Sequence, residues 1–141
     1  WPNDVLLRGG KVAGILLESV GDHLAIGIGV NLAHGPEAST LEARALPAVT
    51  LREAGANVSA EDFLDVLARE YAGLEEQFTT YGFSTIRSAW LAHAARLGEV
   101  ITARTMRDEI TGVFEDVDGA GNLILRTRDG AVPITAADVF F

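Results

Sequence analysis

The sequence predicts an α+β protein, in which part of a mixed β-sheet with helices packed on one face precedes a small β-barrel. Two apolar, strand-like runs at residues 12–18 and 25–32 flank a short turn, which is typical of an antiparallel hairpin. Helical periodicity follows within residues 59–97. Short strand-like runs at even spacing then occupy residues 100–135, the pattern expected of a small barrel.

The N-terminal strands carry further expectations. A short strand at residues 5–7 is predicted to turn back at residues 8–10 into the first long run. The near-continuous hydrophobicity of both long runs predicts that both faces of the hairpin are covered. Because glycine weakens a strand interior, glycines within these runs are expected at bulges or at close backbone approaches. They are Gly14, Gly27 and Gly29.

The middle of the chain is predicted to be a loop followed by helices. Residues 34–46 have weak periodicity and are predicted to form a loop, and residues 51–54 a short helix. The capping pattern Ser-Ala-Glu-Asp and the apolar residues after it predict an amphipathic helix over residues 59–81. Ser84 is predicted to cap a second helix, which ends at Gly98.

Turn dipeptides separate the C-terminal strands. Asp118-Gly119 and Asp129-Gly130 are predicted to form hairpin turns. The strands between and around them are predicted at residues 100–104, 110–115, 123–127 and 131–135. We therefore expect two domains, residues 1–96 and residues 97–141.

Composition disfavours several classes of function. The 141 residues carry a formal net charge of -9, whereas nucleic-acid and anionic membrane surfaces need clustered Lys and Arg. The chain has no cysteine, and its three histidines show no metal-ligand spacing. No apolar run is long enough to span a bilayer and no secretory signal is visible, so we expect a soluble, cytoplasmic protein. Because Met106 is the one methionine, we expect the chain to be part of a longer protein.

Lys11 is the first candidate functional residue. It stands at the entry of an otherwise apolar strand, beside glycines that let a backbone approach a ligand closely. A lysine in this place can hold negative charge where water is scarce. The alternative is a turn lysine with a solvated ammonium group and a stem packed along the surface, and position alone favours that alternative.

Three amide and carboxylate side chains are further candidates. Asn3 and Asp4 lie at a strand end, where they can orient phosphate oxygens or Mg²⁺, which prefers oxygen ligands. The alternative is that both satisfy their own turn backbone. Asn31 ends a glycine-bearing strand, where its amide can pair with an adenine edge through donor and acceptor, or can instead cap a turn. The glycine pair before it is not a dinucleotide fingerprint, because Leu32 stands at the third glycine position.

Three segments together resemble the biotin protein ligases. That family carries Trp-Pro-Asn-Asp after a strand, then a lysine leading into Ala-Gly-Ile-Leu and an acidic residue, then Gly-Ile-Gly-hydrophobic-Asn. The similar segments here are residues 1–4, 11–18 and 27–31. Residues 97–141 resemble the SH3-like C-terminal domain of the family, including the closing Asp138-Val139-Phe140. The resemblance spans essentially the whole chain and implies a biotin/lipoate ligase-like core followed by an SH3-like barrel.

The resemblance implies a two-step reaction that uses biotin, ATP and Mg²⁺. Biotin and ATP give biotinyl-5′-AMP and pyrophosphate, and the biotinyl group then passes to a lysine of the biotin carboxyl carrier protein domain of a carboxylase. Lys11 resembles the catalytic lysine that contacts the biotin carboxyl group and the phosphate. Asn3 and Asp4 resemble residues on the phosphate side, where Mg²⁺ is expected, and Asn31 resembles the adenine contact. The backbone at Gly14, Gly27 and Gly29 is expected to line the substrate and nucleotide site.

The family pattern is incomplete in this chain. The glycine- and arginine-rich loop that grips biotin in the family does not occur in it. We therefore expect the chain to hold half of an active site, to be inactive alone, and to pair with a missing N-terminal half of the catalytic domain; a homodimer is a further candidate partner. Two alternatives stay open, a relative of lipoate-type ligases and a non-catalytic homologue that acts as a binding module.

Overall fold

The structure is a computed structural model. It describes residues 2–37, 46–106, 108–135 and 137–140. The chain divides into two compact units, Pro2–Leu67 and Ala68–Phe141, and helix α1 (Ala60–Tyr81) contributes residues to both. The predicted loop at residues 34–46 falls mostly outside the described residues, as do the two terminal residues.

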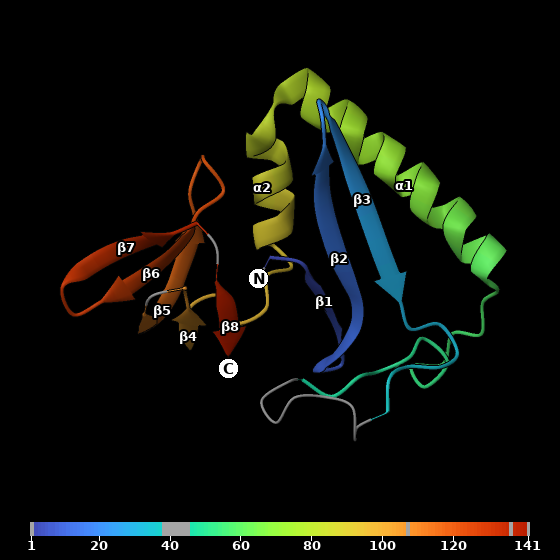
Figure 1. The fold of residues 1–141 in the computed structure, drawn as a ribbon, viewed down its shortest axis with the longest axis horizontal. Helices are drawn as coiled ribbons and strands as arrows, with labels where there is room; N and C mark the ends of the chain where they lie inside the picture. Colours follow the sequence, from blue (N-terminus) through green and yellow to red (C-terminus); the bar gives the residue numbers. More distant parts are fainter. Residues whose placement is uncertain (1, 38–45, 107, 136, 141) are drawn as a thin grey trace. The chain divides into compact units, whose positions relative to one another are not determined.

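The first unit contains a three-stranded antiparallel sheet in the order β1-β2-β3, drawn in blue in Figure 1. The strands are β1 (Asp4–Leu7), β2 (Gly10–Val20) and β3 (His23–Val30). β1 turns into β2 through Arg8 and Gly9, whose φ angles are 50° and 82°. Two successive positive φ angles match the twist of antiparallel strands, so this turn joins β1 and β2 without splaying them. Both predicted hairpins are confirmed.

The glycines Gly27 and Gly29 in β3 do not mark the bulges that the sequence predicts, whereas the register between β1 and β2 shifts at residues 11–13, next to Gly14. The register between β2 and β3 is continuous, and an ideal Cβ on Gly27 or Gly29 would lie no nearer than 3.7 Å to the atoms around it. A close approach occurs at Gly10 instead, where an ideal Cβ would lie 2.8 Å from the carbonyl oxygen of Pro47. Glycine at this position lets residues 47–49 run against the first residues of β2.

The pairing of β2 changes along its length. β3 ends at Val30, opposite Ala13, so the first residues of β2 extend beyond it. There a parallel bridge joins Lys11 to Ala48, from the segment after the loop. Parallel pairing enters the sheet at this bridge, while the named strands are antiparallel.

The outer part of the β2–β3 hairpin is exposed, contrary to the prediction that both faces of both strands are covered. Val12 and Ala13 are 6% exposed. Farther along the hairpin, apolar side chains are 37–64% exposed; they are Leu16, Leu17, Val20, Leu24, Ile26 and Ile28. Covering such a surface is favourable by about 25 cal/mol per Å² of apolar area, so burial of these exposed side chains would stabilise the protein.

The second unit contains a five-stranded sheet in the order β7-β6-β5-β4-β8, with every neighbouring pair antiparallel. Its strands are β4 (Val100–Arg104), β5 (Glu109–Val117), β6 (Leu123–Thr127), β7 (Gly130–Ile134) and β8 (Asp138–Phe140). Alternate residues of these strands point inward and form one core. Its buried members are Ile101, Ala103, Phe114, Val117, Leu123, Leu125 and Ile134. The four predicted strands are confirmed, and β8 is an addition to them.

Helix α2 (Phe83–Leu91) packs on β5 in this unit. The ring centroids of Trp90 and Phe114 are 6.3 Å apart, and Arg87 donates to the Val117 carbonyl oxygen and pairs with Asp116. The helix is therefore held to the sheet by both an aromatic contact and a charged one.

The limits of the helices differ in part from the prediction. α1 begins where the sequence predicts, and the Asp62 amide donates to Ser59 Oγ at 3.0 Å. The prediction that Ser84 caps a helix reaching Gly98 is wrong, because α2 already begins at Phe83 and ends at Leu91. Gly82, with a φ of 76°, makes the break between the helices without a side-chain cap. The predicted short helix at residues 51–54 is a hydrogen-bonded turn.

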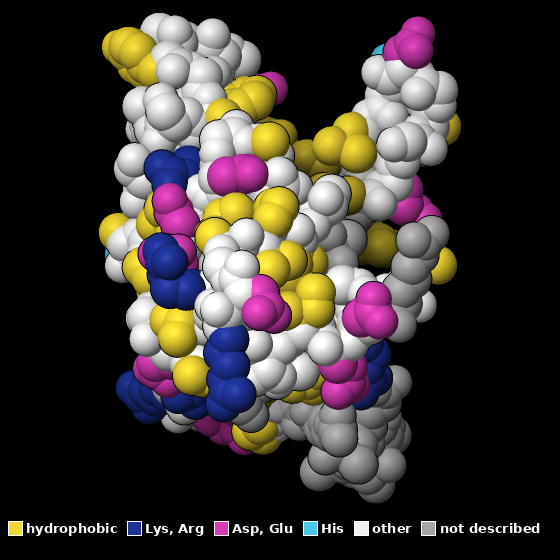
Figure 2. All heavy atoms as spheres, turned by 90° about the vertical axis from the view of Figure 1, so that its left-hand side faces the viewer, with side chains coloured by type: hydrophobic (Ala, Val, Ile, Leu, Met, Phe, Trp, Pro, Cys, Tyr) yellow, Lys and Arg dark blue, Asp and Glu magenta, His cyan; other side chains and the backbone are white. Residues whose placement is uncertain are grey.

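Charged side chains of both signs lie close together on the surface. Figure 2 shows Lys and Arg side chains beside Asp and Glu on one face of the molecule. Ion pairs in the second unit are Arg96–Glu99, Arg104–Glu109 and Arg126–Glu115, and each is substantially exposed. Such pairs stabilise a fold by only about 0–1 kcal/mol each. Among the described residues, no helix combines the length and the apolar character needed to cross a membrane.

We predict that Gly112→Ala destabilises the second unit. An ideal Cβ at this buried position in β5 would lie 2.8 Å from the Arg126 carbonyl oxygen, so the backbone must shift. Overpacking of this kind costs about 1–3 kcal/mol. Gly73→Ala in α1 is the control, since its Cβ meets nothing within 4 Å and alanine should stabilise the helix by about 0.5–1 kcal/mol. Urea unfolding measures both free energies, and equal effects of the two substitutions would contradict the packing argument.

Candidate functional site

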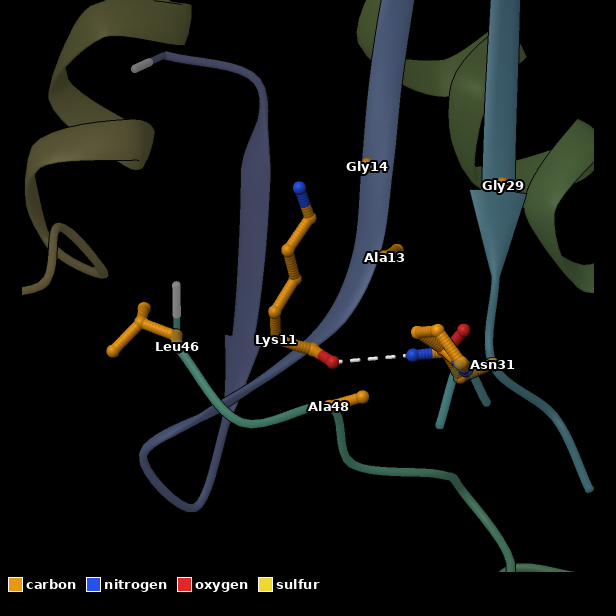
Figure 3. A pocket seen from close by; sticks show the side chains of 8 residues that line it. Lys11, Ala13, Gly14, Gly29, Asn31, Leu46 and Ala48 are labelled. Carbon is orange, nitrogen blue, oxygen red and sulfur yellow. Dashed lines mark hydrogen bonds between the residues drawn. The ribbon is translucent and has the colours of Figure 1, made fainter. Parts of the chain in front are cut away.

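A pocket of about 170 Å³ opens in the first unit, where β2 begins and β3 ends. Figure 3 shows Lys11, Ala13 and Gly14 of β2 on one side, with Gly29 and Asn31 across from them. Pro36, Leu46 and Ala48 complete the lining. Pockets for small ligands usually measure about 300–1,000 Å³, so this pocket is smaller than a typical small-ligand site.

Lys11 directs its ammonium group along β2 toward Gly14 (Figure 3). The side chain pairs with the Asp4 carboxylate on β1, and the two side chains are 46% and 44% exposed. The ammonium group lies over Gly14, where an ideal Cβ would be in ordinary van der Waals contact with Lys11 Nζ at 3.5 Å. An exposed ion pair is worth about 0–1 kcal/mol, so a ligand that carries stronger negative charge can replace Asp4 at small cost.

Asn31 uses both hydrogens of its side-chain amide within the protein. Nδ2 donates to the carbonyl oxygens of Lys11 and Val49, each at 3.2 Å (one of these bonds is dashed in Figure 3). The amide has two N–H donors, so the group left for a ligand is its oxygen, an acceptor. The sequence allowed either a ligand contact through donor and acceptor or a structural cap; the donors here hold the pocket wall in place.

Residues 46–49 form one wall of the pocket and continue into a tight turn. The Thr50 amide and hydroxyl donate to the Glu53 carboxylate at 2.8 and 2.9 Å, and the Glu53 amide donates back to Thr50 Oγ1 at 3.1 Å. These bonds to the charged carboxylate lower the pKa of Glu53, with the Thr50 amide as the largest cause. Arg8 donates to the Ala54 carbonyl oxygen at 3.0 Å, which ties the turn to the β1–β2 connection.

The structure brings four of the predicted site residues into this pocket, namely Lys11, Gly14, Gly29 and Asn31. Asp4 reaches the site through its ion pair with Lys11, whereas Gly27 does not line the pocket. Asn3 accepts a hydrogen bond from the Ile15 amide with its backbone oxygen, and the role of its side chain stays a prediction.

The contribution of residues 46–54 to the site was not predicted from the sequence. The spacing of Thr50 and Glu53 matches a capping box, a recognisable signal for a helix-like turn. Leu46 and Ala48 carry no such signal, because small apolar residues in a non-periodic stretch fit many environments.

A metal site receives limited support from the geometry. Within the described ranges, no three His, Asp, Glu or Cys side chains gather in a way that could hold a metal ion. Asp4, which pairs with Lys11, is a carboxylate near the pocket. Mg²⁺ often binds through one or two carboxylates together with substrate phosphates, so Asp4 fits a metal that arrives with a nucleotide.

Comparison with known proteins identifies relatives for both units. Residues 97–141 match the family model described as the biotin protein ligase C terminal domain. The chain is 55% identical to a biotin--[acetyl-CoA-carboxylase] ligase of Paracoccus denitrificans, over 100% of the chain and 61% of the relative. It is 28% identical to the bifunctional ligase/repressor BirA of Bacillus subtilis, over 99% of the chain and 44% of the relative.

A solved structure, the biotin protein ligase from Aquifex aeolicus in complex with biotin and ATP, matches with a TM-score of 0.79 and 29% identity. This match covers 99% of the chain and 59% of that protein. The chain resembles the biotin protein ligases over its whole length. The predicted α+β class is confirmed, and the C-terminal domain is SH3-like, as in biotin protein ligases. The chain spans less than two thirds of the length of these relatives.

We predict that acid loosens the turn beside the pocket. Because the pKa of Glu53 is lowered from its ordinary value of 4.5, the carboxylate stabilises the fold above pH 4.5 and loses this effect as the pH falls through the lowered value. An NMR titration should show Glu53 and the Thr50 amide changing together with a midpoint below 4.5. Glu53→Gln is the control, since its Thr50 amide should show no such transition. A midpoint at or above 4.5 would contradict the hydrogen-bonded geometry.

Proposed function

We propose that this chain carries the nucleotide side of a biotin protein ligase active site. The observation that carries the proposal is that Lys11, in β2, and Asn31, directly after β3, line one pocket. The 55% identical Paracoccus relative is named as a biotin ligase, which supports biotin over a lipoate-type substrate. The enzyme would activate biotin with ATP and transfer the biotinyl group to a lysine of a carrier protein.

In the first step, a biotin carboxylate oxygen attacks the α-phosphorus of ATP, and the bond to pyrophosphate breaks. Negative charge collects on the phosphate and on the leaving pyrophosphate, so a fixed cation beside them lowers the barrier. Lys11 would supply that cation by exchanging its weak pair with Asp4 for the ligand oxygens. Lys11 would then be the catalytic residue of this chain.

Asn31 would contribute to the selection of adenine. Because its N–H groups are bound to Lys11 and Val49, it can offer only its oxygen to the base. An oxygen acceptor matches the exocyclic amino group of adenine and opposes the carbonyl oxygen at the same position of guanine. The backbone at Gly29 would lie beside the base, since both residues line the pocket.

In the second step, the carrier lysine amine attacks the acyl carbon of biotinyl-5′-AMP, and the bond to AMP breaks. When bound, Mg²⁺ would offset phosphate charge, with Asp4 and Asn3 as its neighbours in this chain. We propose residues 97–141 as a separate domain of this cytoplasmic enzyme, and a biotin carboxyl carrier protein domain as its substrate.

The biotin ring would be held by residues outside this chain. The pocket volume of about 170 Å³ and the exposed β2–β3 surface both support an incomplete site. We propose that an N-terminal half of the catalytic domain covers this surface, that a second copy of the chain is another candidate cover, and that the chain alone is inactive.

We predict that the isolated chain associates through this exposed hairpin surface. Its apolar side chains, including Leu16, Val20 and Leu24, are 56–64% exposed, and exposed apolar strands favour association. Analytical ultracentrifugation should show species larger than a monomer. A variant with Leu16→Lys and Leu24→Lys should shift the distribution toward the monomer. A monodisperse parent chain would contradict the prediction.

We predict that Lys11→Ala in the complete enzyme lowers the rate of biotin-dependent pyrophosphate exchange by ~10²–10³-fold, because it removes a preorganised charge contact. Thermal stability should hardly change, since the lysine side chain is half exposed and packs little. Lys11→Arg is the matched variant, because it keeps the charge but alters its position. Asn31→Ala should mainly raise the KM for ATP. Near-normal pyrophosphate exchange by folded Lys11→Ala would contradict the catalytic role and support the alternative of a solvated turn lysine.

A further inference from the structure

Thr50 and Glu53 lie outside the pocket but are bonded to its wall. Thr50 is 6% exposed, and it is a buried polar residue whose amide and hydroxyl are both satisfied by Glu53. Bonds from two donors to one carboxylate are stronger than neutral hydrogen bonds. Glu53 therefore fixes the conformation of Thr50.

The backbone on each side of Thr50 is hydrogen-bonded to Lys11, in β2, and to Asn31, directly after β3. Before it, Val49 donates to the Lys11 carbonyl oxygen at 3.0 Å and accepts from Asn31 Nδ2. After it, Leu51 donates to the Asn31 carbonyl oxygen at 2.9 Å. A change in the backbone at Thr50 would therefore move the groups that orient Asn31 and the Lys11 backbone.

Arg8 holds the same turn from the other side. Its φ of 50° lies in the left-handed region, which a non-glycine residue adopts at a cost. In this conformation its guanidinium reaches the Ala54 carbonyl oxygen at 3.0 Å. The β1–β2 connection and the Thr50–Glu53 turn are thus joined to each other as well as to the pocket.

We propose that Glu53 is a positioning residue: acting through Thr50, it holds residues 47–49 against Lys11 and Asn31 and so sets the affinity of the pocket for a nucleotide. This inference rests on the proposed nucleotide site for its link to affinity. Glu53 does not line the pocket, so its effect differs from that of a residue in contact with the ligand.

Amide hydrogen exchange tests the positioning without any ligand. In Glu53→Ala, the Lys11 and Val49 amides should exchange about tenfold faster, because the wall loses charge-assisted bonds. Glu53→Gln, which keeps an acceptor oxygen, should restore most of the protection. Arg52→Ala, an exposed change in the same turn, is the control and should leave exchange unchanged. Unchanged exchange in Glu53→Ala, or an equal increase throughout β2 and β3, would overturn the proposal.

Arg8→Gly provides a second variant if Glu53→Ala fails to fold. Glycine adopts the positive φ without strain, so this change removes the guanidinium contact while the turn is retained. Faster exchange at Val49 with an intact β1–β2 hairpin supports the network. Unchanged exchange at Val49 would show that Arg8 does not help to hold residues 47–49.

An NMR titration with ATP then tests the link to affinity. Glu53→Ala should raise the Kd for ATP about tenfold, while Glu53→Gln and Arg52→Ala stay near the parent value. A parent chain that binds ATP, with an unchanged Kd in Glu53→Ala, would overturn the link. A parent chain that binds no ATP would instead contradict the proposed nucleotide site, and the exchange data would continue to test the positioning alone.

Discussion

The site depends on how the backbone of Lys11 is held. Its amide donates to the Pro47 carbonyl oxygen at 2.8 Å, and its carbonyl oxygen accepts from the Val49 amide and from Asn31 Nδ2. These bonds replace the pairing that β2 loses where β3 ends. The pocket lies where the pairing partner of β2 changes from β3 to residues 47–49, because this segment supplies a wall of the pocket.

The same arrangement leaves the Lys11 side chain available. Its backbone is fixed by neighbours on both sides, while its ammonium group forms an exposed pair with Asp4. A lysine that binds a ligand needs a fixed backbone and an ammonium group that can exchange its partner. In Lys11, different atoms meet these two requirements. In Asn31, both roles fall on the side-chain amide. Its N–H groups hold the structure, and in our proposal its oxygen faces a ligand.

Much of this could be predicted from the sequence. The sequence predicts the hairpin and names Lys11 and Asn31 as separate candidates, whereas the structure shows that both line one pocket. The even spacing and turn dipeptides of β4 to β7 and the capping pattern before α1 were also sufficient to predict those elements. Strand β8 is too short for a periodic signal, and Gly82 sets the start of α2 through its φ angle, which no side-chain pattern reveals. The wall at residues 46–49 pairs through its backbone, and backbone pairing leaves little trace in residue identity.

In our proposal, one pocket places Lys11 at the reacting phosphate and Asn31 at the base. A crystal structure with biotinyl-5′-AMP bound tests it most directly. We expect Lys11 Nζ at about 2.7–2.9 Å from a phosphate oxygen, released from Asp4, with Asn31 Oδ1 accepting from the adenine amino group. An adenylate bound elsewhere, or one bound here while Lys11 stays on Asp4, would contradict it.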